Sequence, residues 1–125
     1  MFNFLLVAMG GAIGAAARYG VSLALPARES GWPLATFLIN VSGSLLIGLL
    51  AGWLATRDAA GEPWRLLLGV GVLGGFTTFS AYSLETLRMI ERGDIAGASS
   101  YAVGSVIAGL AAVTLGLFLA RRVFA

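Results

Sequence analysis

The side chains able to do chemistry in this chain are uncharged hydroxyls, amides and aromatic rings, and they gather in residues 74–83, GGFTTFSAYS. Glycine costs a helix roughly 1 kcal/mol relative to alanine, and β-branched threonine adds a smaller cost. We therefore predict that a helix is weakened or broken here, in the middle of a long apolar segment. Backbone groups freed inside a bilayer must be satisfied by protein, water or a bound ion. The stretch thus predicts either a partner subunit that closes over it or a lined pathway.

Other polar and aromatic side chains recur at helical spacing. Tyr101 and Ser105 lie four residues apart, and Phe79 and Tyr82 lie three apart, so each pair shares a helix face. Asn40 carries two N–H donors, which serve either a helix–helix hydrogen bond or an anion. Aromatic ring edges are partly positive, so together with hydroxyl and amide donors they could coordinate a small anion without a fixed cation. A fixed charge would hold the anion too tightly for rapid exit. For each residue taken singly, ordinary packing is the alternative.

Composition excludes several other classes of function. The chain is 58% hydrophobic and 11% charged, with a mean hydropathy of +0.91, whereas soluble domains carry about 25% charged residues. It has no cysteine and no histidine, which excludes disulfides and thiolate metal sites. Its six acidic residues lie near segment ends or in loops, so we expect no catalytic centre and no enzyme activity. The scattered arginines predict interfacial anchors and no nucleic-acid partner.

Four apolar segments are near the roughly 20 residues that a membrane-spanning helix requires. They cover about residues 3–25, 33–55, 64–89 and 95–119, with Trp32 and Trp53 near the two ends of the second. The start of the chain lacks the basic region of a signal peptide, so we expect a first transmembrane helix and a multi-pass protein of a bacterial inner membrane. The predicted fold is one all-α transmembrane domain over residues 1–125, with both termini on one side. Small residues four apart predict close helix packing: Gly10 and Gly14, Gly48 and Gly52, Ser105 and Gly109.

The arginines divide equally between the two predicted sides of the membrane. Orientation normally follows an excess of Lys and Arg on the cytoplasmic side, and here there is none. Both orientations should then insert with similar free energy, which would allow an antiparallel homodimer. The alternative is a single topology fixed by something that the count misses. One side carries Arg57, Arg65, Arg121 and Arg122, and the other carries Arg18, Arg28, Arg88 and Arg92.

Three of these motifs together resemble a known family. They are residues 10–19 (GGAIGAAARY), residues 36–43 (TFLINVSG), which contain Asn40, and residues 74–80 (GGFTTFS). The combination, which extends over nearly the whole chain, resembles the Fluc (CrcB-type) fluoride channel family. The resemblance implies an antiparallel, dual-topology homodimer in the lipid bilayer with two fluoride pores. It also implies a central sodium ion held by the backbone carbonyls of Gly74 and Thr77 from both subunits.

The resemblance further implies which side chains meet fluoride. The two pore-lining aromatic positions match Phe79 and Tyr82, the second-helix asparagine matches Asn40, and the polar track of the fourth helix matches Tyr101 and Ser105. Two positions depart from the family pattern. The second aromatic is usually phenylalanine and is Tyr82 here, and the next track position is often serine and is Gly109 here.

The expected function is therefore a fluoride-selective channel for passive export that lowers cytoplasmic fluoride. The main alternative is a small dual-topology, proton-coupled multidrug exporter. That class needs a membrane-embedded carboxylate, normally in the first helix, and the first segment here has none. Glu85 is the nearest candidate, and an i,i+3 ion pair with Arg88 is its simpler explanation. A structural subunit without transport activity is a third possibility, which the polar track disfavours.

Overall fold

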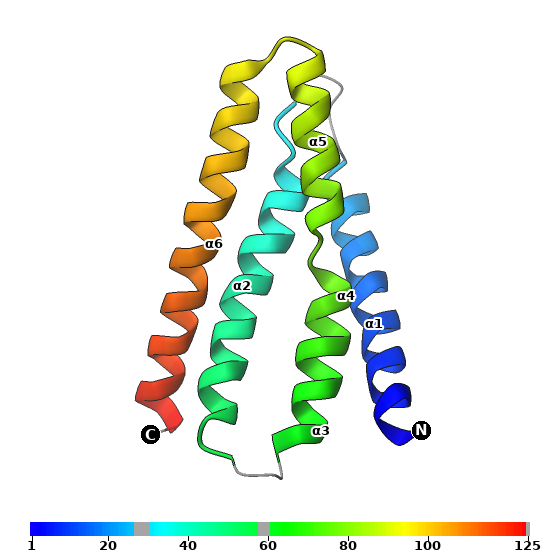
Figure 1. Cartoon of the computed structure of the whole chain (residues 1–125), viewed down its shortest axis with the longest axis vertical. Helices are drawn as coiled ribbons and strands as arrows, with labels where there is room; N and C mark the ends of the chain where they lie inside the picture. Colours follow the sequence, from blue (N-terminus) through cyan, green and yellow to red (C-terminus); the bar gives the residue numbers. More distant parts are fainter. Residues whose placement is uncertain (27–30, 58–60, 125) are drawn as a thin grey trace.

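The computed structural model describes residues 1–26, 31–57 and 61–124, and these are almost entirely helical. Four helical spans in them are long and apolar enough to cross a membrane, and they cover Phe2–Ala24, Leu34–Leu54, Glu62–Glu91 and Ile95–Phe124. The described chain is thus an all-helical, multi-pass membrane protein, with its two termini at the same end (Figure 1). The elements in order are α1 (Phe2–Ala24), α2 (Leu34–Leu54), α3 (Glu62–Trp64), η2 (Arg65–Leu73), α4 (Gly74–Phe76), α5 (Phe79–Glu91) and α6 (Ile95–Phe124).

Prolines and one glycine set several of the helix ends. Helix α1 ends at Ala24, just before Pro26, because a proline disfavours helical backbone in the residue that precedes it. Pro33 is the N-cap of α2, and Pro63 lies in the first turn of α3, where the missing N–H costs nothing. Gly93 has φ +79° in the turn between α5 and α6, a left-handed conformation that glycine adopts readily.

The third span consists of several pieces. Its first half, η2, is a π-helix of nine residues, a form that is rare and often marks functional sites. Helix α4 ends at Phe76, and α5 begins at Phe79. Thr77 (φ −77°, ψ 156°) and Thr78 (φ −151°, ψ 121°) between them have extended backbone, and both lie within residues 74–83. The sequence pattern had not predicted the π-helix.

Helices α2 and α6 make the most extensive contact in the described chain, and small residues allow it. A Cβ atom on Gly48 would collide with the carbonyl oxygen of Val113, and one on Gly116 would collide with that of Leu45. Backbones this close are typical of small-residue faces in membrane helices. The close packing predicted for Gly48 and Gly52 is therefore found here.

Helix α1 packs against the first half of the third span in the same way. A Cβ on Gly10 would meet the Leu67 carbonyl, and one on Gly14 would meet the Val72 carbonyl. From the other side, Gly75 lies against the backbone of Gly11. These contacts fix η2 and α4 to α1, and both elements also contact α2.

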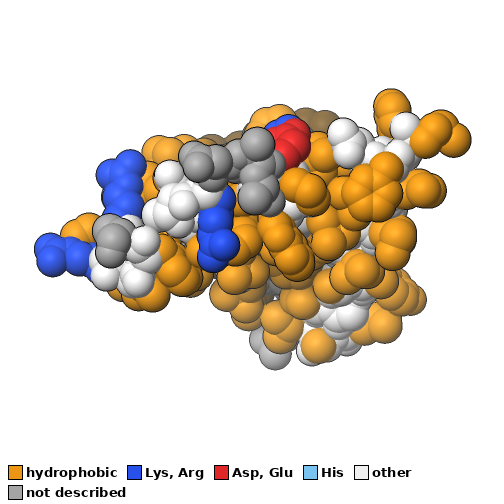
Figure 2. Space-filling view, turned by 90° about the horizontal axis from the view of Figure 1, so that it is seen from below, with side chains coloured by type: hydrophobic (Ala, Val, Ile, Leu, Met, Phe, Trp, Pro, Cys, Tyr) orange, Lys and Arg blue, Asp and Glu red, His pale blue; other side chains and the backbone are white. Residues whose placement is uncertain are grey.

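The surface of the chain suits a membrane. Most large apolar side chains are exposed, as on helices that face lipid or another subunit. Figure 2 shows the end with both termini, where arginine side chains gather toward one side and apolar side chains cover most of the view. Arg57 stacks on Trp53 at 4.9 Å, and Arg65 pairs with Glu62 at 2.7 Å. Arg28, one of the eight arginines counted above, lies outside the described residues.

Candidate functional site

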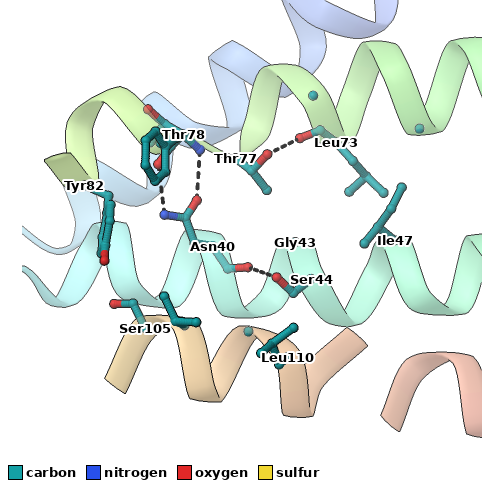
Figure 3. Close-up of a pocket in the computed structure, with 15 residues that line it drawn as sticks. Asn40, Gly43, Ser44, Ile47, Leu73, Thr77, Thr78, Tyr82, Ser105 and Leu110 are labelled. Atoms are coloured by element: carbon teal, nitrogen blue, oxygen red, sulfur yellow. Dashed lines mark hydrogen bonds between the residues drawn. The ribbon is translucent and has the colours of Figure 1, made fainter. Parts of the chain in front are cut away.

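A cavity of about 500 Å³ lies between α2, the third span and α6, beside the extended residues (Figure 3). It gathers residues far apart in sequence. Of the predicted site residues, it is lined by Asn40, Gly74, Thr77, Phe79, Tyr82 and Ser105, whereas Tyr101 is not part of its lining. Its remaining walls are largely apolar or glycine, so the polar groups are a few donors and acceptors among apolar surfaces.

Asn40 is bonded to the backbone of the third span. Its Oδ1 accepts from the N–H of Thr78 at 2.8 Å, and its Nδ2 donates to the carbonyl of Thr78 at 2.9 Å (Figure 3). The amide therefore satisfies both backbone groups of an extended residue inside the span. The Nδ2 group has a second hydrogen, and no partner for it is found among the described residues. Of the two uses expected for Asn40, the structure shows a bond between spans and leaves one donor available.

The same bond frees a carbonyl. In a continuous α-helix the N–H of Thr78 would donate to the carbonyl of Gly74, four residues earlier. Here that N–H is taken by Asn40, while Thr77 N and Oγ1 both donate to Leu73 at 3.0 and 2.9 Å. The Gly74 carbonyl thus loses its usual helical donor next to the cavity.

The N-terminus of α5 opens at the cavity. Thr78 is its N-cap and accepts from the N–H of Ala81 at 3.2 Å, and its hydroxyl also lies 3.2 Å from the Ser80 hydroxyl. The first N–H groups of a helix lack intrahelical acceptors, and the helix dipole makes this end partly positive. An anion in the cavity beside Phe79 would therefore meet a favourable potential without any charged side chain.

Ser105 and two aromatic rings form the α6 side of the cavity. Ser105 Oγ is buried and has no hydrogen-bond partner among the described residues. Tyr82 donates its hydroxyl to the carbonyl of Ala102 at 3.0 Å, and its ring lies 5.5 Å from that of Phe79. Phe79 itself is 78% exposed in the single chain. A buried hydroxyl without a partner costs about 1–3 kcal/mol, so Ser105 is poised to donate to a bound species.

A second polar cluster adjoins the cavity, and sequence reasoning predicted only part of it. The Glu85 carboxylate accepts from Thr36 Oγ1 at 2.8 Å and from the Tyr101 hydroxyl at 2.7 Å. Tyr101 also lies 5.4 Å, ring to ring, from Tyr82, which lines the cavity. Since Tyr101 is one helical turn from Ser105, the cluster continues the line of polar groups toward one end of α6.

The expected ion pair between Glu85 and Arg88 is wrong. The only salt bridge among residues 1–26, 31–57 and 61–124 joins Glu62 to Arg65. Glu85 instead accepts hydrogen bonds from hydroxyl groups of α2 and α6, two helices that contact α5. The sequence signal for this cluster was one carboxylate late in an apolar span, and its partners lie 49 and 16 residues away along the chain.

The comparison with known proteins assigns a family. The family model described as CrcB-like protein, Camphor Resistance (CrcB), matches residues 5–117. The chain belongs to this family. A protein of Phenylobacterium zucineum (strain HLK1) is 59% identical over 127 residues, covering 100% of both chains. One of Caulobacter sp. (strain K31) is 56% identical over 126 residues, covering 99% of this chain and 98% of its own length. Both carry the name "Fluoride-specific ion channel FluC".

The described part of this CrcB-like chain offers oxygen ligands and few others for a cation. No group of three or more His, Cys, Asp or Glu side chains in that part could hold a metal ion. The Gly74 carbonyl, without its helical donor, and the backbone of Thr77 are the groups present at the interruption. Carbonyl oxygens are the ligands that hard cations such as Na⁺ prefer, so the residues fit such an ion.

Proposed function

We propose that this CrcB-like protein is a fluoride-selective channel that lets fluoride leave the cytoplasm passively. The observation that supports it best is the cavity in which uncharged donors converge: the second N–H of Asn40, the Ser105 hydroxyl and the start of α5. Its relatives named above are called fluoride-specific ion channels and not multidrug exporters. We therefore keep the channel proposal alone.

The donors would act by replacing water around the ion. Fluoride is small and strongly hydrated, so a narrow path must offer hydrogen-bond donors at each stop. In the proposed pathway fluoride moves between Asn40, the ring edges of Phe79 and Tyr82, and Ser105, and continues past Tyr101 along α6. No charged side chain of the described residues lines the cavity, which keeps each stop weak enough for the ion to leave.

We further propose that two copies assemble as an antiparallel homodimer. Phe79 is 78% exposed, and Val106 and Leu110, which line the cavity from α6, are 54% and 62% exposed. A second copy across this face would bury these side chains and close the cavity.

A cysteine in place of Val123, which is 70% exposed near the C-terminus, tests the topology, because the chain has no other cysteine. An impermeant thiol reagent should label one fraction from outside intact cells and the rest only after permeabilisation. Labelling from a single side would contradict the proposal.

Efflux from liposomes tests the function itself. Vesicles of the purified protein are loaded with fluoride or chloride, and an ion-selective electrode follows release. We expect fluoride to leave much faster than chloride, and empty vesicles to release neither. Equal rates for the two anions would overturn the proposal.

A further inference from the structure

Two members of the polar cluster, Thr36 and Tyr101, are buried, while the third, Glu85, is half-buried. Tyr101 is 0% exposed and Thr36 is 6% exposed. The cluster continues the proposed pathway beyond Ser105, so an ion that travels along α6 meets a covered site before it meets bulk water. Conduction along this path therefore requires that a side chain covering Tyr101 moves aside.

Trp32 lies directly against Tyr101. Its ring is 5.1 Å from the Tyr101 ring, edge to face at 81°, and 4.9 Å from the Phe37 ring. Its indole N–H donates to Ser100 Oγ at 3.2 Å, which ties it to α6. With 37% of its surface exposed, Trp32 has one side on the buried cluster and one side outward.

Trp32 is also the part of this cover that can move most easily. Phe37 and Met89 pack against Tyr101 from inside α2 and α5, so displacing them would disturb a helix. Trp32 instead precedes Pro33, the N-cap of α2, and lies outside any helix. Among the described residues, one hydrogen bond and two ring contacts hold its indole in place. An exposed indole can change rotamer without unwinding the chain.

We propose that Trp32 is a lid over Tyr101 at its end of the polar track, and that water and ions reach Thr36 and Tyr101 from this end only when its indole swings away. The conduction part of this inference rests on the proposed function, but the closure of the cluster does not. The competing explanation is a simple interfacial anchor, a common use of tryptophan at membrane boundaries. Trp53 at the other end of α2 provides a matched control, since it packs on Trp64 at 6.3 Å and beneath Arg57.

Thiol labelling tests the lid without relying on transport. The chain has no cysteine, so Thr36→Cys places a single thiol in the cluster, in place of the threonine hydroxyl and methyl groups. Met89→Cys, at a position 2% exposed beside Tyr101, serves as a second reporter. Each is reconstituted as the full chain and treated with a small, charged methanethiosulfonate reagent, alone and combined with Trp32→Ala or Trp53→Ala. We expect Trp32→Ala to speed labelling by about tenfold or more, because an open state of at most a tenth of molecules becomes the only one.

The labelling rates distinguish a lid from an interfacial anchor. Trp53→Ala should leave the labelling rate unchanged, because Trp53 has no contact with the cluster. Equal labelling rates with and without Trp32 at both reporters would overturn the lid. Fluoride and chloride efflux from the unsubstituted protein are measured alongside. If that protein shows no preference for fluoride, the proposed function fails, and the labelling rates still decide whether Trp32 closes the cluster.

Discussion

Asn40 joins the second span to the interruption of the third through two hydrogen bonds to Thr78. The sequence was enough to single out this residue, because an amide in an apolar segment needs a partner. It was not enough to name the partner, which lies 38 positions away. The same limit applies to Glu85, whose hydroxyl partners could not be inferred from residues close to it in sequence.

Replacing Asn40 by alanine should both destabilise the protein and abolish fluoride efflux. The substitution leaves the N–H of Thr78 unpaired inside the span, at about 1–3 kcal/mol, and removes one donor from the Thr78 carbonyl. Thermal unfolding in detergent and liposome efflux measure the two effects. Ser42→Ala is the matched control, because Ser42 bonds only to carbonyls of its own helix, at 2.6 and 3.2 Å. A variant at position 40 as stable and active as the Ser42 variant would contradict this role.

Glu85→Gln should lower the free energy of unfolding by about 1.5–3 kcal/mol, the usual contribution of a hydrogen bond to a charged group. The amide offers one acceptor oxygen where the carboxylate offered two, so one of the two hydroxyls loses its acceptor. A double-mutant cycle with Thr36→Val, followed by thermal unfolding, should reveal a coupling energy, because the two side chains are in contact. Glu91→Gln, exposed at the end of α5, is the control. Additive effects at positions 36 and 85 would count against a shared cluster.

At the scale of elements, the four spans could be predicted closely, because their lengths and apolar composition leave few choices. The observed ends differ from the predicted ends by only a few residues. Helix α6, for example, continues beyond residue 119 to Phe124 and includes Arg121 and Arg122. The π-helix η2 could not be predicted. It packs against α1 where Gly71 meets Gly10, and no periodicity in the sequence distinguishes a π-helix from an α-helix there.

Gly43→Ala tests how α2 and the interruption fit together. A Cβ at position 43 would collide with the side chain of Thr77, whereas one on Gly104 of α6 would meet no atom within 4 Å. We expect Gly43→Ala to displace Thr77 and reduce fluoride efflux by about tenfold, equivalent to about 1.4 kcal/mol. Gly104→Ala should keep normal efflux and gain up to about 1 kcal/mol of helix stability. Normal efflux in both variants would show that the position of Thr77 is unimportant.

At the scale of the whole molecule, family membership and a multi-pass helical chain are established, and the antiparallel homodimer is a proposal. A single chain leaves Phe79 and one wall of the cavity exposed, which is why its assembly cannot be deduced from the chain alone. Equal numbers of arginines on the two sides favour dual topology but do not choose the pairing of subunits.

Sodium should stabilise the assembled protein. A ligand that binds only the folded state raises the free energy of unfolding with its concentration. We propose a sodium ion at the carbonyls of Gly74 and Thr77. We therefore expect the unfolding midpoint to rise with sodium chloride and not with equal N-methylglucamine chloride, because the organic cation is too large for a site built for sodium. The Gly43→Ala variant should lose this dependence. Identical midpoints in both salts would remove the sodium site from the account.

The most direct test of the account is the reversal potential of currents through the purified protein in a planar bilayer, with fluoride on one side and chloride on the other. A pathway built from uncharged donors around Asn40 and Ser105 should carry fluoride almost alone. We therefore predict a reversal potential shifted strongly in the direction that opposes fluoride flow. A potential near zero, which means that both anions pass equally well, would contradict the account.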